Sequence, residues 1–162
     1  MGKKSFAGLS ALVLAFAMLS GPFAEAAEVT RESYKEAVEP ICKRNVEANE
    51  RILKGVKSEV KAGKLKAAAT QFTKAANESH KAIGQLKGVA QPPADEAKLA
   101  KWLKYIGEEE SLFRQIAKKL KAGDKNGATR MQIQLQHTAN KANNQVLVFE
   151  FRYCRVEPSK FS

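Results

Sequence analysis

Apolar residues recur at three- and four-residue steps through most of this chain, and no segment alternates apolar and polar residues as a half-buried strand does. This periodicity predicts four helices, at about residues 31–61, 65–86, 93–120 and 128–156. Proline removes a backbone donor and clashes with the preceding turn, so Pro40 is expected to start or kink the main section of the first helix. The pattern therefore indicates an all-α protein.

The connections between these helices indicate how they are arranged. A weak internal repeat relates VKAGKLKAAATQF, which begins at Val60, to LKAGDKNGATRMQI, which begins at Leu120. Both copies place a Lys-Ala-Gly stop after a helix, and glycine is the usual residue just beyond a helix C-terminus. Because tight connections make neighbouring helices antiparallel, the expected fold is an antiparallel up-down-up-down four-helix bundle.

The last predicted helix contains the apolar stretch NNQVLVFEFRYCR. At helical spacing, Val146, Phe149 and Tyr153 continue its core stripe. Leu147 and Phe151 point to a second side, which is expected to be covered by another part of the chain or by a partner molecule.

The N-terminus has the pattern of a secretory signal peptide. Lys3 and Lys4 precede an apolar run, and Ala24-Glu25-Ala26 fits the small-x-small rule for cleavage before Ala27. The run, residues 6–19, is shorter than the roughly 20 residues of a membrane span. We therefore expect a signal peptide at residues 1–26, general secretion to an extracytoplasmic location, no transmembrane anchor after cleavage, and one helical domain at residues 27–162.

Export changes the interpretation of the two cysteines. Exported proteins meet an oxidising environment, so Cys42 and Cys154 are expected to form a structural disulfide. In the expected bundle they lie at the same end, where the bond would join the first helix to the fourth. Two free thiols or an intermolecular bridge are the alternatives.

The chain is strongly basic, with a formal net charge of +11. Removal of residues 1–26 leaves 26 basic and 16 acidic residues, a net charge of +10. The positive charge is spread over all four helices and aromatic residues do not interleave with it, so nucleic-acid binding is not expected. Weak association with anionic envelope polymers is one interpretation, and a soluble, self-repelling surface is the other.

Four segments of the chain resemble a family of small secreted all-helical proteins of actinobacteria, chiefly from soil-dwelling lineages. They are EPICKRN, ANERILKGVK, QPPADEAKLAKWL and KANNQVLVFEFRYCRVEPSKF, and the similarity covers essentially all of residues 27–162. The resemblance implies export, the pair of cysteines and the helical architecture. It implies no activity, and no catalytic or binding residue is carried over from it.

Three polar residues fall at or beside predicted core positions. Asn45 and Asn49 lie near the centre of the apolar face of the first helix, either as a polar layer that fixes helix register or as part of a ligand pocket. Glu109, with Glu110, lies at the margin of the third helix's buried stripe. It could be buried with a raised pKa, could pair with a cation across the bundle such as Arg130 or His137, or could lie on a solvated face.

The sequence contains few of the residue patterns that indicate catalysis or metal binding. Neither His80 nor His137 has the glutamate three residues earlier that a di-iron bundle requires, so no metal and no cofactor is expected. No nucleophile has an identifiable partner. The sequence therefore predicts a non-enzymatic exported bundle that binds or interacts at or outside the cell envelope. The alternative is a small-ligand or haem carrier with a polar interior around Asn45, Asn49 and His137.

Overall fold

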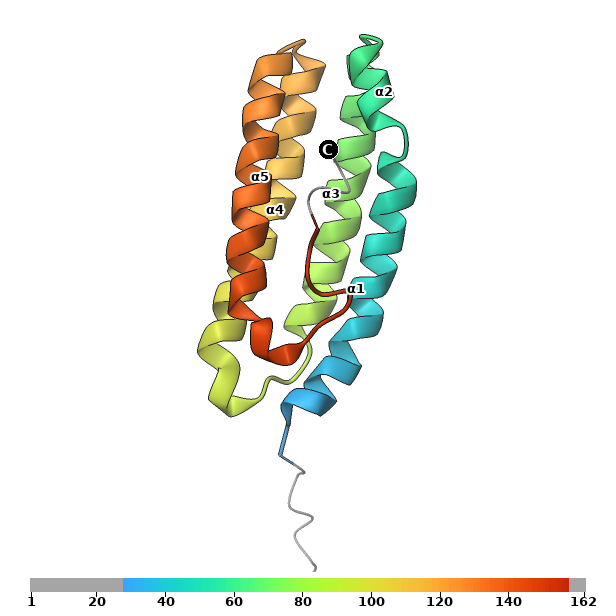
Figure 1. The fold of residues 1–162 in the computed structure, drawn as a ribbon. Coiled ribbons are helices and arrows are strands. Elements are labelled where there is room, and N and C mark those ends of the chain that lie inside the picture. Colours follow the sequence, from blue (N-terminus) through green and yellow to red (C-terminus); the bar gives the residue numbers. More distant parts are fainter. Residues whose placement is uncertain (1–27, 158–162) are drawn as a thin grey trace, which may run out of the picture.

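Four long helices run alternately up and down in the computed structural model, which describes residues 28–157 (Figure 1). They are α1 (Arg31–Leu53), α3 (Leu65–Lys87), α4 (Glu96–Lys121) and α5 (Lys125–Gln145). A short helix, α2 (Val56–Lys61), follows α1, and a 3-10 turn (Pro93–Asp95) precedes α4. This confirms the all-α four-helix fold. The predicted signal peptide, residues 1–26, lies outside the described residues.

The first predicted helix is in fact two helices. α1 begins after Thr30, whose side chain and that of Ser33 cap each other's backbone amides. Pro40 lies inside α1 and does not start it. The helix ends at Leu53 because Gly55 adopts a φ of +83°, which a continuous helix cannot contain. The prediction of one helix over residues 31–61 is therefore wrong.

The two glycine stops of the internal repeat have the same geometry. Gly63 and Gly123 have φ values of +76° and +79°. The next residues, Lys64 and Asp124, donate their amides to carbonyls five residues earlier, a Schellman C-cap in both copies. The repeat therefore marks two equivalent turns at one end of the fold.

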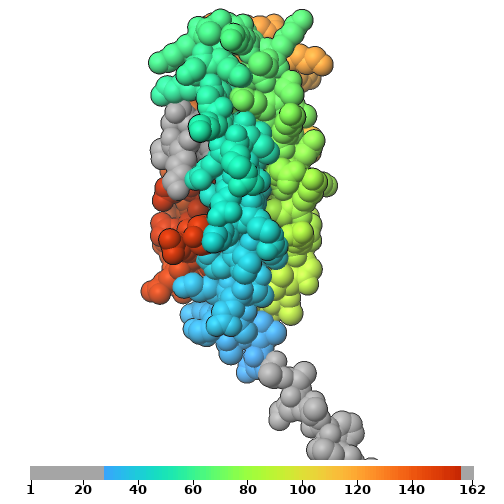
Figure 2. All heavy atoms as spheres, turned by 90° about the vertical axis from the view of Figure 1, so that its right-hand side faces the viewer, coloured from blue at the N-terminus to red at the C-terminus, as the bar shows by residue number. Residues whose placement is uncertain are grey.

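The helices pack in chain order, α1 on α3, α3 on α4 and α4 on α5. α1 and α5 do not form such a close pair. Residues 150–157, which we call the C-terminal strap, cross from the end of α5 to α1, and Figure 2 shows them lying against α1. A closed bundle would need a direct contact between its first and last helices, and here the strap bridges the two instead.

The end of α5 differs most from prediction. The helix stops at Gln145, a 3-10 turn follows at Leu147–Phe149, and Glu150 has a φ of +49° before the strap begins. Val146 and Phe149 are buried as predicted. Phe151 is also buried, stacked on Phe149, whereas Leu147 is half exposed. The prediction that helix continues to about residue 156 is wrong, and so is the pairing of Leu147 with Phe151 on one side.

The core consists of two apolar clusters, one towards each end of the molecule. The first surrounds Phe72 and Phe113, and the second surrounds Trp102, Phe149 and Phe151. In each long helix, one buried polar residue lies between the apolar residues that the helix adds to the first cluster and those that it adds to the second. These residues are Asn49 on α1, Ser79 on α3, Glu109 on α4 and Thr138 on α5. The middle of the fold is therefore a polar layer to which every long helix contributes.

Candidate functional site

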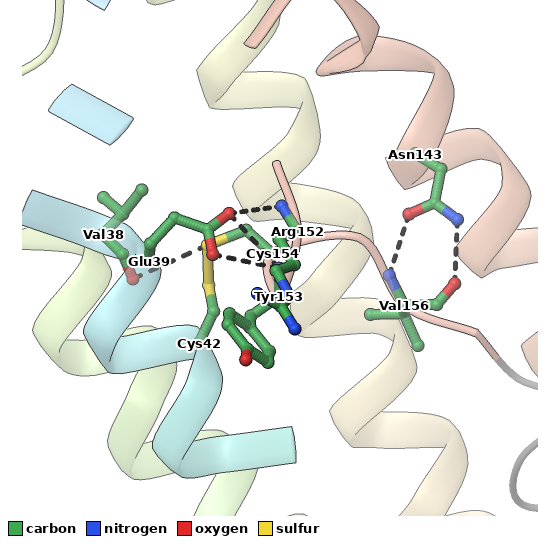
Figure 3. The surroundings of a disulfide bond; sticks show 8 residues. All are labelled: Val38, Glu39, Cys42, Asn143, Arg152, Tyr153, Cys154 and Val156. Atoms are coloured by element: carbon green, nitrogen blue, oxygen red, sulfur yellow. Dashed lines mark hydrogen bonds between the residues drawn. A yellow bond between two sulfur atoms is a disulfide. The ribbon is translucent and has the colours of Figure 1, made fainter. Parts of the chain in front are cut away.

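The strap is fixed to both helices that it bridges (Figure 3). A disulfide joins Cys154 to Cys42 of α1, with Cα atoms 5.0 Å apart. One carboxylate oxygen of Glu39 accepts from the amide of Arg152 at 2.6 Å, and the other accepts from the next amide at 3.0 Å. The side-chain amide of Asn143 on α5 accepts from the Val156 amide and donates to the Val156 carbonyl. The predicted disulfide is confirmed, but Cys154 belongs to the strap and not to the fourth helix.

The polar layer contains a short hydrogen-bonded chain. Asn49 is buried, and its Nδ2 donates to Ser79 Oγ at 3.1 Å and to Asn45 Oδ1 at 3.2 Å. These bonds agree with the interpretation of Asn45 and Asn49 as a polar layer that fixes helix register. Asn49 Oδ1 is also buried, and it has no hydrogen-bond partner among the described residues. The layer thus fixes α1 against α3 while leaving an acceptor unused.

A chamber lies beside this layer, between α1, α3, α4 and the strap. It has a volume of about 50 Å³. Asn45 and Ser79 line it from the polar layer, Trp102 and Glu109 from α4, and Tyr153 and Cys154 from the strap. A cavity needs roughly 10–15 Å³ for each water, so this one has room for a few waters or a small group.

Glu109 is the chemically distinctive residue of the chamber. Its side chain is 6% exposed, and its Oε1 has no hydrogen-bond partner among the described residues. Because burial penalises the charged form, the pKa of Glu109 is raised to about 8. Near neutral pH this carboxyl therefore holds a proton that an exposed glutamate would have lost.

Trp102 adds an unused donor to the same chamber. Its side chain is 1% exposed, and its indole Nε1 has no acceptor among the described residues. Buried polar atoms are normally paired, so Trp102 Nε1 and Glu109 Oε1 are exceptions, and both belong to residues that line one cavity.

Glu110 behaves differently from its neighbour. It accepts from Arg114 Nε at 2.5 Å and lies 3.7 Å from His80 Nδ1, so its partners come from α3 and from its own helix. Neither Glu109 nor Glu110 pairs with Arg130 or His137; of the three alternatives, burial with a raised pKa is the one that the structure shows for Glu109.

The structure brings three of the four predicted interior residues together. Asn45, Asn49 and Glu109 lie at or beside the chamber, whereas His137 is on the exposed side of α5. The predicted polar interior therefore does not include His137. Trp102 was not among the predicted site residues, because the sequence gives no sign that its indole donor is left without an acceptor.

Metal and haem ligands do not converge on the chamber. Within residues 28–157, no group of three or more His, Cys, Asp or Glu side chains could hold a metal ion. His80 and His137 are exposed, and the described lining of the chamber contains neither histidine nor methionine. Separately, none of the described helices is long and apolar enough to span a membrane.

A second hollow lies on the outer surface between α3 and α4. This groove has a volume of about 420 Å³ and combines four cations with two threonines and two alanines. The cations are Lys66, Arg114, Lys118 and Lys121, and no carboxylate is among the described residues that line it. We call it the basic groove.

Fold and site together define a disulfide-pinned, all-α four-helix protein with a mainly apolar chamber that contains Glu109 and with a basic outer groove. In the comparisons with known proteins, no family model matches the chain, and neither a curated protein nor a solved structure matches it. The function must therefore be argued from the geometry.

Proposed function

We propose that this protein is an exported, non-enzymatic binding module that acts at or outside the cell envelope and attaches to phosphate-rich anionic polymers there. The basic groove carries the proposal. The N-terminal signal pattern and the resemblance to secreted actinobacterial proteins support export, and the Cys42–Cys154 disulfide fits an oxidising compartment.

The groove concentrates charge that is otherwise spread over the surface. Three of these cations are exposed, so their hydrated ammonium groups are accessible to a ligand from solution. They are Lys66, Lys118 and Lys121. Arg114 is already held by Glu110, so it contributes less free charge. An anionic polymer that lies along the groove would meet several cations at once, and it would release its counterions as it bound.

Co-sedimentation with purified cell walls and with anionic lipid vesicles tests this proposal and separates the two sources of phosphate. The triple variant Lys66→Glu, Lys118→Glu, Lys121→Glu should lose most of the binding at low salt. The matched control, Lys54→Glu, Lys101→Glu, Lys141→Glu, changes the net charge equally at exposed positions outside the groove and should keep most of it. Equal loss in both variants would mean that net charge alone drives association. Turnover of a substrate by the purified protein would contradict the non-enzymatic assignment.

A second function, as a small-ligand carrier, is favoured by one specific observation. Glu109 Oε1 and Trp102 Nε1 are buried without a hydrogen-bond partner among the described residues, and both residues line one chamber. Haem is not part of this candidate, because the described lining of the chamber contains neither histidine nor methionine and its volume of about 50 Å³ holds only a few atoms. Mass spectrometry of the protein purified from its own host under non-denaturing conditions should reveal a bound molecule of low mass.

A further inference from the structure

We propose that the chamber binds a small organic cation, an ammonium compound with an oxygen atom near its nitrogen, and that Glu109 is its anionic partner. This inference rests on the carrier function proposed above and adds the chemical class of the ligand.

The described lining of the chamber lacks the positive charge that is spread over the rest of the molecule. The chain has a net charge of +11, yet the described lining of the chamber contains two carboxylates, Glu109 and Glu110, and no lysine, arginine or histidine. Once Glu109 has lost its proton, a cation that entered would meet its carboxylate, since Glu110 is already held by Arg114. An anion would meet no cationic side chain among the described residues that line the chamber.

The unpaired atoms specify the two ends of the ligand. Glu109 Oε1 is an acceptor that an ammonium N–H would satisfy, whereas Trp102 Nε1 is a donor that requires an oxygen. The two residues lie seven positions apart on α4, so they share a face of the helix about 10 Å apart along its axis. Both residues line the same chamber. A ligand with nitrogen and oxygen on adjacent carbons suits this pair of groups, and the ring of Trp102 also favours a neighbouring cation.

The size of the chamber limits the ligand to a few atoms. At about 50 Å³ it has roughly a third of the volume of the engineered apolar cavity of about 150 Å³ that accommodates benzene. Ethanolamine, with four heavy atoms, is therefore a suitable probe. Such a small ligand cannot bind more tightly than about tens of micromolar.

Binding should depend on pH through Glu109, because an ammonium ligand requires the carboxylate and the empty chamber favours the neutral acid. The other titratable groups of the chamber are Glu110, held by Arg114, and the Tyr153 phenol on the strap. Ser79 from α3 and Asn45 from α1 do not titrate. Affinity should therefore rise as the pH passes from 6 to 9, with a proton released on binding.

Trp102 supplies the assay, because it is the only tryptophan of the chain. The full chain is expressed through an export pathway with its disulfide formed, and the indole fluorescence and indole N–H resonance are followed during titration with ethanolamine at pH 8.5. Ethylene glycol is the neutral control of the same size, and acetate is the anionic control. We expect ethanolamine alone to shift both signals.

Glu109→Gln keeps the shape of the side chain and removes its charge. It should weaken ethanolamine binding by at least about tenfold, the range expected for a hydrogen bond to a charged group. Glu108→Gln removes an exposed carboxylate one residue away and should leave the affinity within about twofold. If Glu109→Gln does not fold, the pH dependence of the wild-type protein decides in its place.

The outcomes separate this inference from the function on which it rests. Equal binding of ethylene glycol and ethanolamine would overturn the cationic ligand and leave the carrier function standing. Undiminished binding to Glu109→Gln, or an affinity that does not change between pH 6 and 9, would overturn the role of Glu109. No response of either Trp102 signal to any probe, with no bound molecule in the protein from its own host, would overturn both proposals.

Discussion

Ionisation of Glu109 should make the folded protein less stable as the pH rises. Burial raises the pKa of Glu109 from 4.5 to about 8 in the folded state, while the unfolded chain keeps the ordinary value. Between these two values the folded protein holds a proton that the unfolded chain has released. The stabilisation is fully present below pH 4.5 and is lost as the pH rises through 8. At about 1.4 kcal/mol for each pKa unit, the change amounts to about 5 kcal/mol.

The variant Glu109→Gln isolates this contribution, since glutamine does not titrate. Free energies of unfolding would be measured by urea denaturation of both proteins at pH 4.5, 7 and 9, with the disulfide intact. All other titrating groups are common to the two proteins, so their effects cancel in the difference. The variant should gain about 5 kcal/mol relative to the wild type between pH 4.5 and 9.

Glu108→Gln is the matched control, because Glu108 is exposed on the same helix and lies 3.8 Å from Lys104. Exposed pairs of this kind contribute roughly 0–1 kcal/mol, so this variant should follow the wild type at every pH. A difference between wild type and Glu109→Gln that does not change with pH would refute the reasoning. It would mean that Glu109 is solvated or paired in the folded protein.

Three further predictions concern the strap and the helix breaks. Replacing Cys42 and Cys154 with serine opens a loop with a sequence separation of 112 and should cost about 4–5 kcal/mol in urea denaturation without loss of helical circular dichroism; an unchanged stability would contradict it. Glu39→Ala should speed hydrogen exchange at the two strap amides that this carboxylate accepts from, whereas unaltered exchange would mean that the disulfide alone holds them. Gly55→Ala should lower the melting temperature, because a side chain in the left-handed conformation costs about 1–2 kcal/mol. Gly84→Ala, at an exposed position inside α3, should raise the melting temperature, because alanine favours a helix over glycine by about 1 kcal/mol. Shifts of the same sign in the two variants would contradict this account.

The helices could be predicted because their periodicity is a local property of the sequence. Leu65–Lys87 was predicted within one residue, since a Lys-Ala-Gly stop precedes it and its apolar face is continuous. The breaks were missed for a different reason. Leu53 and Val56, on either side of Gly55, are apolar residues three positions apart, which is the spacing of a continuous helix. Only the backbone conformation shows that the helix is interrupted there.

The path of the last residues could not be predicted from spacing. Val146, Phe149 and Phe151 are all buried, and a helix would have separated Phe151 from the other two. Tertiary contacts determine the path of this segment. The disulfide, Glu39 and Asn143 hold it in an extended conformation that local propensity does not encode. The chamber was unpredictable for the same reason, because the strap forms one of its walls.

The strap and the buried acid are coupled through that wall. Tyr153 and Cys154 line the same chamber as Glu109, so the bond to Cys42 holds one wall of that chamber in place. The disulfide contributes about 4–5 kcal/mol, similar to the roughly 5 kcal/mol that ionisation of Glu109 costs at high pH. A domain of this size has a total stability of about 5–15 kcal/mol, so without the disulfide the ionised acid would remove much of what is left. The disulfide thus offsets most of the cost of ionising a buried glutamate in the interior of the fold.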